Sequence, residues 1–122
     1  MITPQLVIEI HDAILAEEPG LIGMPEPGKL EGALARIDNK ILYQGVNDVF
    51  SIAALYAEAL ARGHCFNDAN KRTALVTALT YLDLQGIELI RSQKLEDIMV
   101  DVASGALEPE TMADLLYSLA CS

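Results

Sequence analysis

The stretch ANKRTALVTALTYLDLQ, residues 69–85, decides the fold. Apolar residues occupy most positions after Thr73, so they do not form the single stripe of a surface helix. A helix that is apolar nearly all round has to be covered on all sides. Gly86 follows and can end the helix. The stretch therefore predicts a central, buried helix that starts near Ala69 and reaches about Gln85.

Outward from this helix, apolar residues recur at helical spacing in five more segments, with capping residues or prolines before them. The expected helices run from Thr3-Pro4 to Pro19-Gly20, from about Lys29 to Gln44, from about Val49 to Arg62 after a capping Asp48, from Ser92 to near Gly105, and from Glu108-Pro109 to about Ala120. No segment has the pattern of a sheet. We expect an all-α protein, a compact bundle of about six helices around the central one, in a single domain over residues 1–122.

The chain has 122 residues and a formal net charge of −10, from 18 acidic and 8 basic residues. This balance is unsuited to direct nucleic-acid binding, because phosphate contacts need a basic surface. With 52% apolar residues, the chain is not a disordered acidic tail. No apolar run reaches the roughly 18 residues of a membrane span, and residues 1–11 lack the pattern of a secretion signal. Cys65 and Cys121 make no disulfide framework, so we expect free thiols and a cytoplasmic protein.

The segment RGHCFNDANKRT, residues 62–73, gathers a histidine, an aspartate, two asparagines and three cations before the central helix. Cations in a first helical turn oppose the helix dipole, whereas an anion is stabilised there. Lys71 and Arg72 in this place indicate a bound phosphate, although they could also be solvated or paired with nearby acids. Six of the eight basic residues lie between positions 29 and 72, which supports an anion site in this half. Lys29 could approach the same site or be solvated.

The other polar residues of this segment fit phosphate chemistry. His64 could act as a general base on a hydroxyl, although a lone histidine is more often structural. Asp68 is an oxygen ligand suited to Mg²⁺ that bridges phosphates, and either Asp68 or Asn67 could instead cap the helix. Asn70 could bind a phosphate or orient the loop.

Two less polar residues lie within the same loop. Phe66 is expected to anchor the loop in the core. Cys65 stands next to His64 and could be a nucleophile, but a buried, inert thiol is the favoured interpretation.

The nine residues His64–Arg72, HCFNDANKR, resemble the signature loop of the Fic/Doc family, and most closely its Doc (death-on-curing) branch. The Fic form reads H-x-F-x-D/E-G-N-G-R-x-x-R. The Doc form has a lysine in place of the second glycine, and Lys71 occupies that position in this chain. Residues 20–28 resemble the family's flap, residues 53–63 the helix that leads into the motif, and residues 103–122 its ending. The resemblance covers nearly the whole chain.

This resemblance implies a compact helical toxin of a toxin–antitoxin pair. A Doc toxin is a serine/threonine protein kinase that transfers the γ-phosphate of ATP to a threonine of translation elongation factor Tu and so stops protein synthesis. The implied catalytic residues are His64 as general base, Asp68 as Mg²⁺ ligand, and Arg72. The flap would dock the target segment by strand-like pairing. The implied phosphate-binding residues are Asn70, Lys71, Arg72 and Thr73.

The chain departs from the Fic form at several positions. Ala69 and Lys71 replace both glycines, and Leu75 replaces the second arginine, which argues against the transfer of AMP that Fic proteins perform. Val76 stands where a Doc protein has a polar asparagine. The self-inhibitory pattern of many Fic proteins is absent, so restraint would come from a separate Phd-like antitoxin whose disordered tail covers the site. The alternatives are an AMP transferase that acts on a protein hydroxyl and a catalytically silent binding module with the Fic fold.

Overall fold

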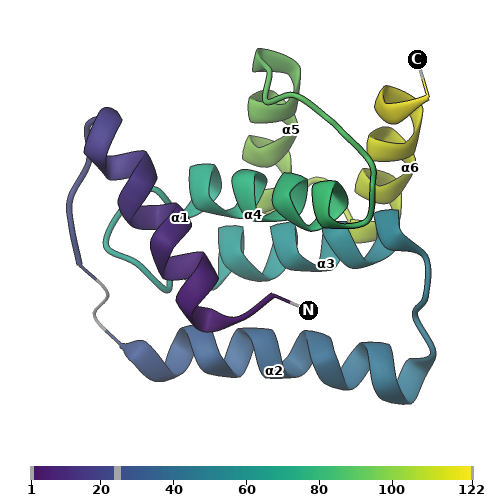
Figure 1. The fold of residues 1–122 in the computed structure, drawn as a ribbon, viewed down its shortest axis with the longest axis horizontal. Coiled ribbons are helices and arrows are strands. Elements are labelled where there is room, and N and C mark those ends of the chain that lie inside the picture. The colour runs from purple at the N-terminus through teal and green to yellow at the C-terminus, as the bar shows by residue number, and fades with distance from the viewer. Residues whose placement is uncertain (1, 24–25, 122) are drawn as a thin grey trace.

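The computed structural model of the chain describes residues 2–23 and 26–121. Within these residues it contains six α-helices and no strand (Figure 1). The all-α prediction is confirmed, and the expected helix ends lie within a few residues of those observed. The helices are α1 (Pro4–Glu17), α2 (Pro27–Gln44), α3 (Val49–Arg62), α4 (Asn70–Leu84), α5 (Gln93–Ser104) and α6 (Pro109–Ala120).

Local sequence signals explain where the helices begin. The Asp48 carboxylate accepts a hydrogen bond from the Ser51 backbone N–H at 2.9 Å and caps α3, as expected. The hydroxyls of Thr3 and Ser92 cap α1 and α5 in the same way. Proline stands in the first turn of α1, α2 and α6, where its missing N–H costs no helical hydrogen bond. For this reason α2 begins at Pro27, earlier than expected.

Helices α3 and α4 lie side by side and antiparallel at the centre of the molecule (Figure 1). The expected burial of α4 is confirmed, since Leu75 and Leu82 have no exposed surface. Helix α3 is also buried and packs against α2, α5 and α6 as well as α4. The centre of the bundle is therefore this pair rather than α4 alone.

Small side chains make up part of the buried surface of both central helices. The fully buried alanines of α3 and α4 belong to one continuous core cluster. Methyl side chains let two helix backbones approach closely, which shortens the distance between the helix axes. These alanines are Ala53, Ala54 and Ala57 on α3, and Ala74 and Ala78 on α4.

The remaining helices cover the pair from different sides. Helix α1 crosses near the start of α4, α2 runs along α3, and α5 and α6 stand across the pair on the other side (Figure 1). The connection 63–69 between α3 and α4 lies at one end of the pair, beside the chain that leaves α1. None of the described helices has both the length and the hydrophobicity needed to cross a membrane.

Two leucines on α4 test the buried core directly. Leu82 is fully buried, whereas Leu84 is 62% exposed near the end of the same helix. Leu82→Ala is expected to lower the free energy of unfolding by about 2–5 kcal/mol, because it removes buried methyl groups and leaves a cavity. Leu84→Ala should change it by less than about 0.5 kcal/mol. Urea unfolding of both variants gives the comparison, and equal losses would contradict the central position of α4.

Candidate functional site

The loop 63–69 has a left-handed backbone near both ends. His64 has a φ of 50° and Ala69 a φ of 65°, values that residues with a side chain rarely adopt. Such backbone is held only where surrounding contacts determine it strongly, and it is common at functional sites. Ala69 is also the N-cap of α4.

Asn70 closes this loop with its side chain. Its Oδ1 accepts from the Phe66 backbone N–H at 3.1 Å, and its Nδ2 donates to the Phe66 carbonyl at 3.0 Å. The role of orienting the loop is therefore confirmed, and phosphate binding by Asn70, which lines the cavity described below, stays a prediction. Phe66 is buried with 5% exposure, so its expected place in the core is confirmed.

The start of α4 has no side-chain cap. Neither Asn67 nor Asp68 accepts from the first helical N–H groups, so the capping interpretation is wrong for both. The Asn67 side chain instead donates to the Ile22 carbonyl at 3.1 Å. The first backbone N–H groups of a helix lack intrahelical partners and carry the positive end of the dipole. Lys71 and Arg72 add two positive charges in the same turn, so the local field favours an anion.

A cavity of about 390 Å³ lies over this helix start. It brings together most of the predicted site residues, and His64 is exposed beside it. No hydrogen bond joins the His64 ring to another residue in the part of the chain that the structure describes, so its ring nitrogens remain available for proton transfer. The lining residues are Ala61, His64, Asn67, Asp68, Ala69, Asn70, Lys71, Arg72 and Ala103.

The Asp68 carboxylate accepts two backbone hydrogen bonds. Its Oδ1 accepts from the Ala69 N–H at 2.7 Å, and its Oδ2 accepts from the Leu21 N–H at 3.1 Å. These two donors hold the pKa of Asp68 below its ordinary value, with a smaller contribution from the Arg72 charge 3.8 Å away. The group is therefore an anion at neutral pH.

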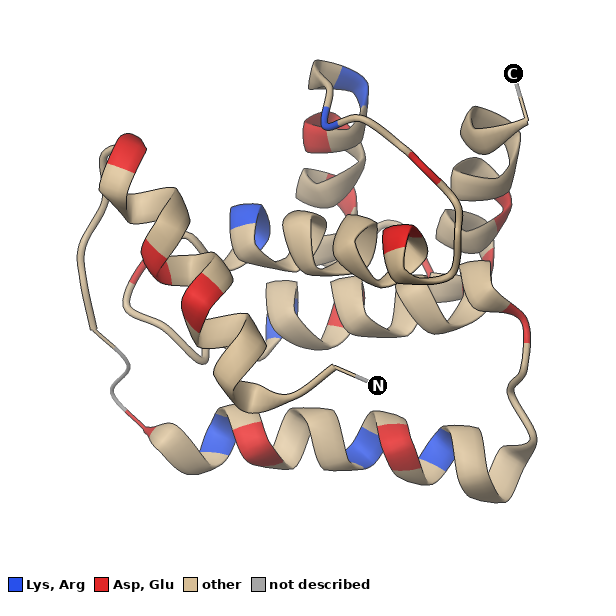
Figure 2. Ribbon diagram, viewed as in Figure 1, with Lys and Arg blue, Asp and Glu red and all other residues tan. Residues whose placement is uncertain are grey.

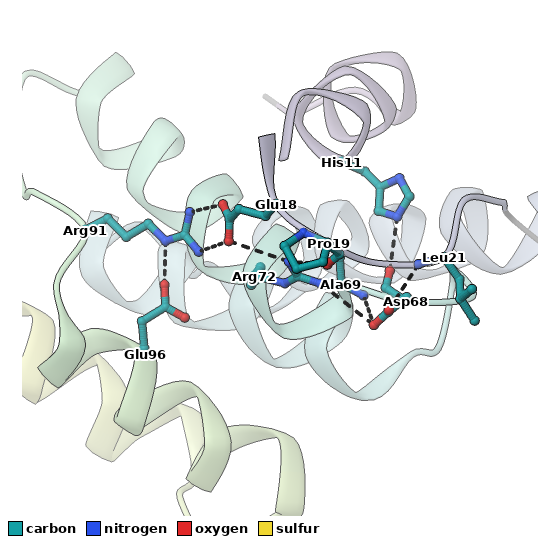
Figure 3. A network of polar contacts seen from close by, with 9 residues as sticks. All are labelled: His11, Glu18, Pro19, Leu21, Asp68, Ala69, Arg72, Arg91 and Glu96. Atoms are coloured by element: carbon teal, nitrogen blue, oxygen red, sulfur yellow. Dashed lines mark hydrogen bonds and ion pairs between the residues drawn. The ribbon is translucent and has the colours of Figure 1, made fainter. Parts of the chain in front are cut away.

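The Arg72 guanidinium belongs to a network of charges that links three parts of the chain (Figure 3). It donates to the Pro19 carbonyl at 3.0 Å and lies 3.5 Å from Glu18. Glu18 in turn accepts two hydrogen bonds from Arg91, at 2.9 and 3.2 Å, and Arg91 also contacts Glu96. Hydrogen bonding to Arg91 lowers the pKa of Glu18. The pairing of Arg72 with nearby acids is thus observed.

Lys71 differs from Arg72 in its surroundings. Its side chain is exposed, and it forms no ion pair among residues 2–23 and 26–121. This lysine is therefore a free cation at the cavity.

The segment after α1 packs against the site through two glycines. A Cβ on Gly20 would lie 2.5 Å from the Leu15 side chain and 3.1 Å from both Arg72 and Asp68. Gly23 has a φ of 125°, and its carbonyl accepts from the Asn67 N–H at 2.9 Å. Residues 20–23 therefore follow the loop closely, while Met24 and Pro25 of the expected flap lie outside the described residues.

Comparison with known proteins identifies the family of this chain. The model of the Fic/DOC family matches residues 1–82. The chain belongs to the Fic/Doc family. "Protein kinase doc" of Escherichia phage P1 is 41% identical over 118 residues, which cover 97% of this chain and 94% of the relative. "Toxin Doc" of Mycolicibacterium smegmatis is 30% identical over 109 residues, covering 84% and 82%. The Doc branch indicated by Lys71 is thereby confirmed.

One predicted phosphate ligand of this Fic/Doc site lies away from the cavity. Thr73 is fully buried, and its hydroxyl has no hydrogen-bond partner among the described residues. Its side chain is therefore not placed to bind a phosphate in this geometry, because it lies inside the core. Cys65 is likewise buried, and burial raises the pKa of its thiol, in agreement with an inert cysteine.

Most of the cations that lie near one another in the sequence do not lie at the Fic/Doc site in the structure. Arg36, Lys40 and Arg62 line a separate groove between α2 and α3, of about 270 Å³. Arg62 lies 3.6 Å from Glu58, and Lys29 pairs with Glu26 instead of entering the cavity. Figure 2 shows these cations spread over α2 and α3 among acidic residues. Among the basic residues that the structure describes, Lys71 and Arg72 alone line the cavity, so the expectation that the cations of residues 29–72 gather at one anion site is wrong for the others.

Three residues of the Fic/Doc site were missed from the sequence. His11 donates to the Asp68 carbonyl at 3.0 Å, and Glu18 and Arg91 extend the charge network of Arg72. His11 had a visible signal, because it lies within the apolar stripe of Val7 and Ile14 on α1. Glu18 and Arg91 had none, since their contacts join distant parts of the chain.

A Mg²⁺ ion fits this Fic/Doc donor set together with a phosphate. Asp68 supplies one carboxylate at the cavity, and no group of three or more metal-binding side chains occurs among the described residues. Mg²⁺ in nucleotide sites is held by one or two carboxylates plus phosphate oxygens and water. Asp68 is thus suited to a metal that arrives with a nucleotide.

The lowered pKa values of Asp68 and Glu18 predict how stability depends on pH. A carboxylate whose pKa is lower in the folded state stabilises the fold above its unfolded pKa, near 4, and this contribution is lost as pH falls through the folded value. Urea unfolding between about pH 6 and pH 3 should therefore show a shallower loss of stability in Asp68→Asn than in the unaltered protein. Asp114→Asn, an exposed carboxylate change on α6, should follow the unaltered protein. Identical slopes for the two variants would contradict the role of the Asp68 hydrogen bonds.

Proposed function

We propose that this chain is the toxin of a toxin–antitoxin pair and a serine/threonine protein kinase that uses ATP and Mg²⁺. Its substrate would be a threonine of translation elongation factor Tu, and phosphorylation there would block translation in the cytoplasm. The observation that carries the proposal is the cavity that joins His64, Asp68, Lys71 and Arg72 at the uncapped start of α4. A relative over nearly the whole chain is named a protein kinase.

Each residue has a part in the proposed transfer. The α4 N–H groups, with Lys71 and Arg72, would bind the ATP phosphates and stabilise the charge that develops on the γ-phosphoryl group. Arg72 has five N–H donors, so it can contact a phosphate while it keeps its bond to Pro19. Asp68 would hold Mg²⁺, which supplies charge neutralisation between phosphates when bound. His64 would accept the hydroxyl proton as the threonine oxygen bonds to the γ-phosphorus and ADP leaves.

Two side chains of α4 support transfer of phosphate over transfer of AMP. Leu75, at the position of the second Fic arginine, is fully buried and does not line the cavity. The site therefore lacks that second guanidinium. Lys71 stands exposed at the cavity where the Fic form has a glycine. Both features favour the kinase over the AMP transferase.

Labelled ATP tests this proposal. With γ-labelled ATP and Mg²⁺, the chain should label elongation factor Tu, and α-labelled ATP should give no label. His64→Ala should lower the rate by at least about a hundredfold, because the general base is lost. Lys94→Ala, on α5 outside the cavity, is the matched control and should act like the unaltered protein. Label from α-labelled ATP would favour AMP transfer, and growth inhibition that survives His64→Ala would favour a silent binding module.

The segment 20–23 is proposed to dock the protein substrate. Leu21 and Ile22 are 68% and 81% exposed, and their backbone bonds to Asp68 and Asn67 of the cavity lining. Some backbone groups of this segment already bond to Asn67 and Asp68, so an extended substrate segment would pair with the backbone groups that these bonds leave free.

Substitution of these two side chains tests whether the segment docks the protein substrate. Leu21→Ser and Ile22→Ser together should raise KM for the protein substrate about tenfold or more, because apolar contact area is lost. KM for ATP should stay unchanged, since neither side chain lines the phosphate cavity. Leu84→Ser, a change of a leucine that is 62% exposed on α4, is the control. A rise in KM for ATP alone would refute docking through this segment.

The antitoxin is proposed as a separate, Phd-like partner. Two relatives of this chain are Doc proteins, and one is named a toxin. A disordered antitoxin tail that folds over the cavity would exclude both ATP and the substrate. Binding to DNA would belong to the antitoxin, because this chain carries a net charge of −10.

A further inference from the structure

His11 is a buried polar residue on α1 that the proposed transfer does not use. It is 1% exposed and lies between the buried Val7 and Ile14 on the inner face of the helix. A buried polar ring without a partner is costly, so its contacts reveal what it does. Its Nδ1 faces the exposed carboxylate of Asp12 at 3.4 Å.

The other side of the ring contacts the loop 63–69 twice. Nε2 lies 3.0 Å from the Asp68 carbonyl oxygen, which can only accept, so Nε2 carries the hydrogen and donates it (Figure 3). The ring also stacks on Phe66, with centroids 3.8 Å apart and planes 10° from parallel. One side chain thus contacts the loop on both sides of Asn67.

The hydrogen bond to Asp68 acts on the peptide unit that determines the backbone of Ala69. This unit carries the Asp68 carbonyl and the Ala69 N–H, and its orientation sets the φ of 65° at Ala69. His11 holds the carbonyl end, and the Asp68 carboxylate accepts from the N–H end at 2.7 Å. A rotation of this unit would therefore turn the carboxylate as well.

We propose that His11 is a positioning residue of the site. By fixing the 68–69 peptide unit and supporting Phe66, it keeps the Asp68 carboxylate directed at the cavity and the first N–H groups of α4 open to a phosphate. His11 touches neither substrate nor phosphate and acts through Asp68. This inference rests on the proposed function only for its kinetic consequence, since the contacts themselves belong to the fold.

Three variants separate positioning from general stability. His11→Leu keeps an apolar volume but removes the donor, whereas His11→Gln keeps an N–H donor of similar reach. Val7→Ala is the matched control, a loss of buried volume one turn earlier on the same helix. Hydrogen exchange of the backbone amides of residues 63–70, measured by mass spectrometry on the full chain, reports on the loop without ATP or metal.

The expected result is local to the loop. His11→Leu should speed exchange in residues 63–70 about tenfold beyond Val7→Ala at equal melting temperature, and His11→Gln should restore most of the protection. Loop exchange in His11→Leu no faster than in Val7→Ala, or no recovery in His11→Gln, would overturn the inference. If His11→Leu does not fold, hydrogen exchange in His11→Gln decides the question. Near-native protection of residues 63–70 in His11→Gln supports positioning, and a loss of protection equal to that in the rest of the chain contradicts it.

Kinetics provide a second readout in the same variants. His11→Leu should lower kcat at least about tenfold and leave KM for the protein substrate unchanged, because the metal ligand is misdirected while residues 20–23 keep their exposed side chains. An equal loss in Val7→Ala would overturn positioning. If the unaltered protein transfers no phosphate at all, the proposed function fails, and the exchange comparison still decides the role of His11.

Discussion

The close packing of α3 against α4 is the contact on which the rest of the structure depends. Both helices bury alanines in the core, and small side chains allow helix backbones to lie near one another. Because the two helices are antiparallel, the short connection 63–69 must reverse the chain at one end of the pair (Figure 1). That reversal leaves the start of α4 open at the surface, which makes the positive end of a buried helix available to a ligand.

Carboxylates of the preceding loop and of the segment after α1 offset the positive charge of Arg72 at this helix start. Arg72 lies 3.8 Å from the Asp68 carboxylate and 3.5 Å from the Glu18 carboxylate. Both carboxylates offset the charge of Arg72, and Arg91 holds Glu18 in place. The chain therefore supplies its own anions at a position that favours a phosphate. Lys71 receives no such partner among the described residues, so the two neighbouring cations have different surroundings.

Most of the fold and the centre of the site could be predicted from the sequence because they depend on local patterns. Helical spacing, the Asp48 cap and the density of polar residues in 62–73 all act over a few positions. Contacts across the chain could not be predicted. His11 and Asp68 are 57 positions apart, and Glu18 and Arg91 are 73 apart. Nearness in sequence misled the prediction for Arg36 and Lys40, which lie along a different groove.

Two of the three alanines that line the cavity lie outside the loop 63–69 and limit the space that the site offers. Ala61 comes from α3 and Ala103 from α5, and both line the cavity from elements outside the motif. A larger side chain at either position would project into the cavity, or would push apart helices that pack at native density. The methyl groups of Ala61 and Ala103 thus leave room in the cavity that larger side chains would fill.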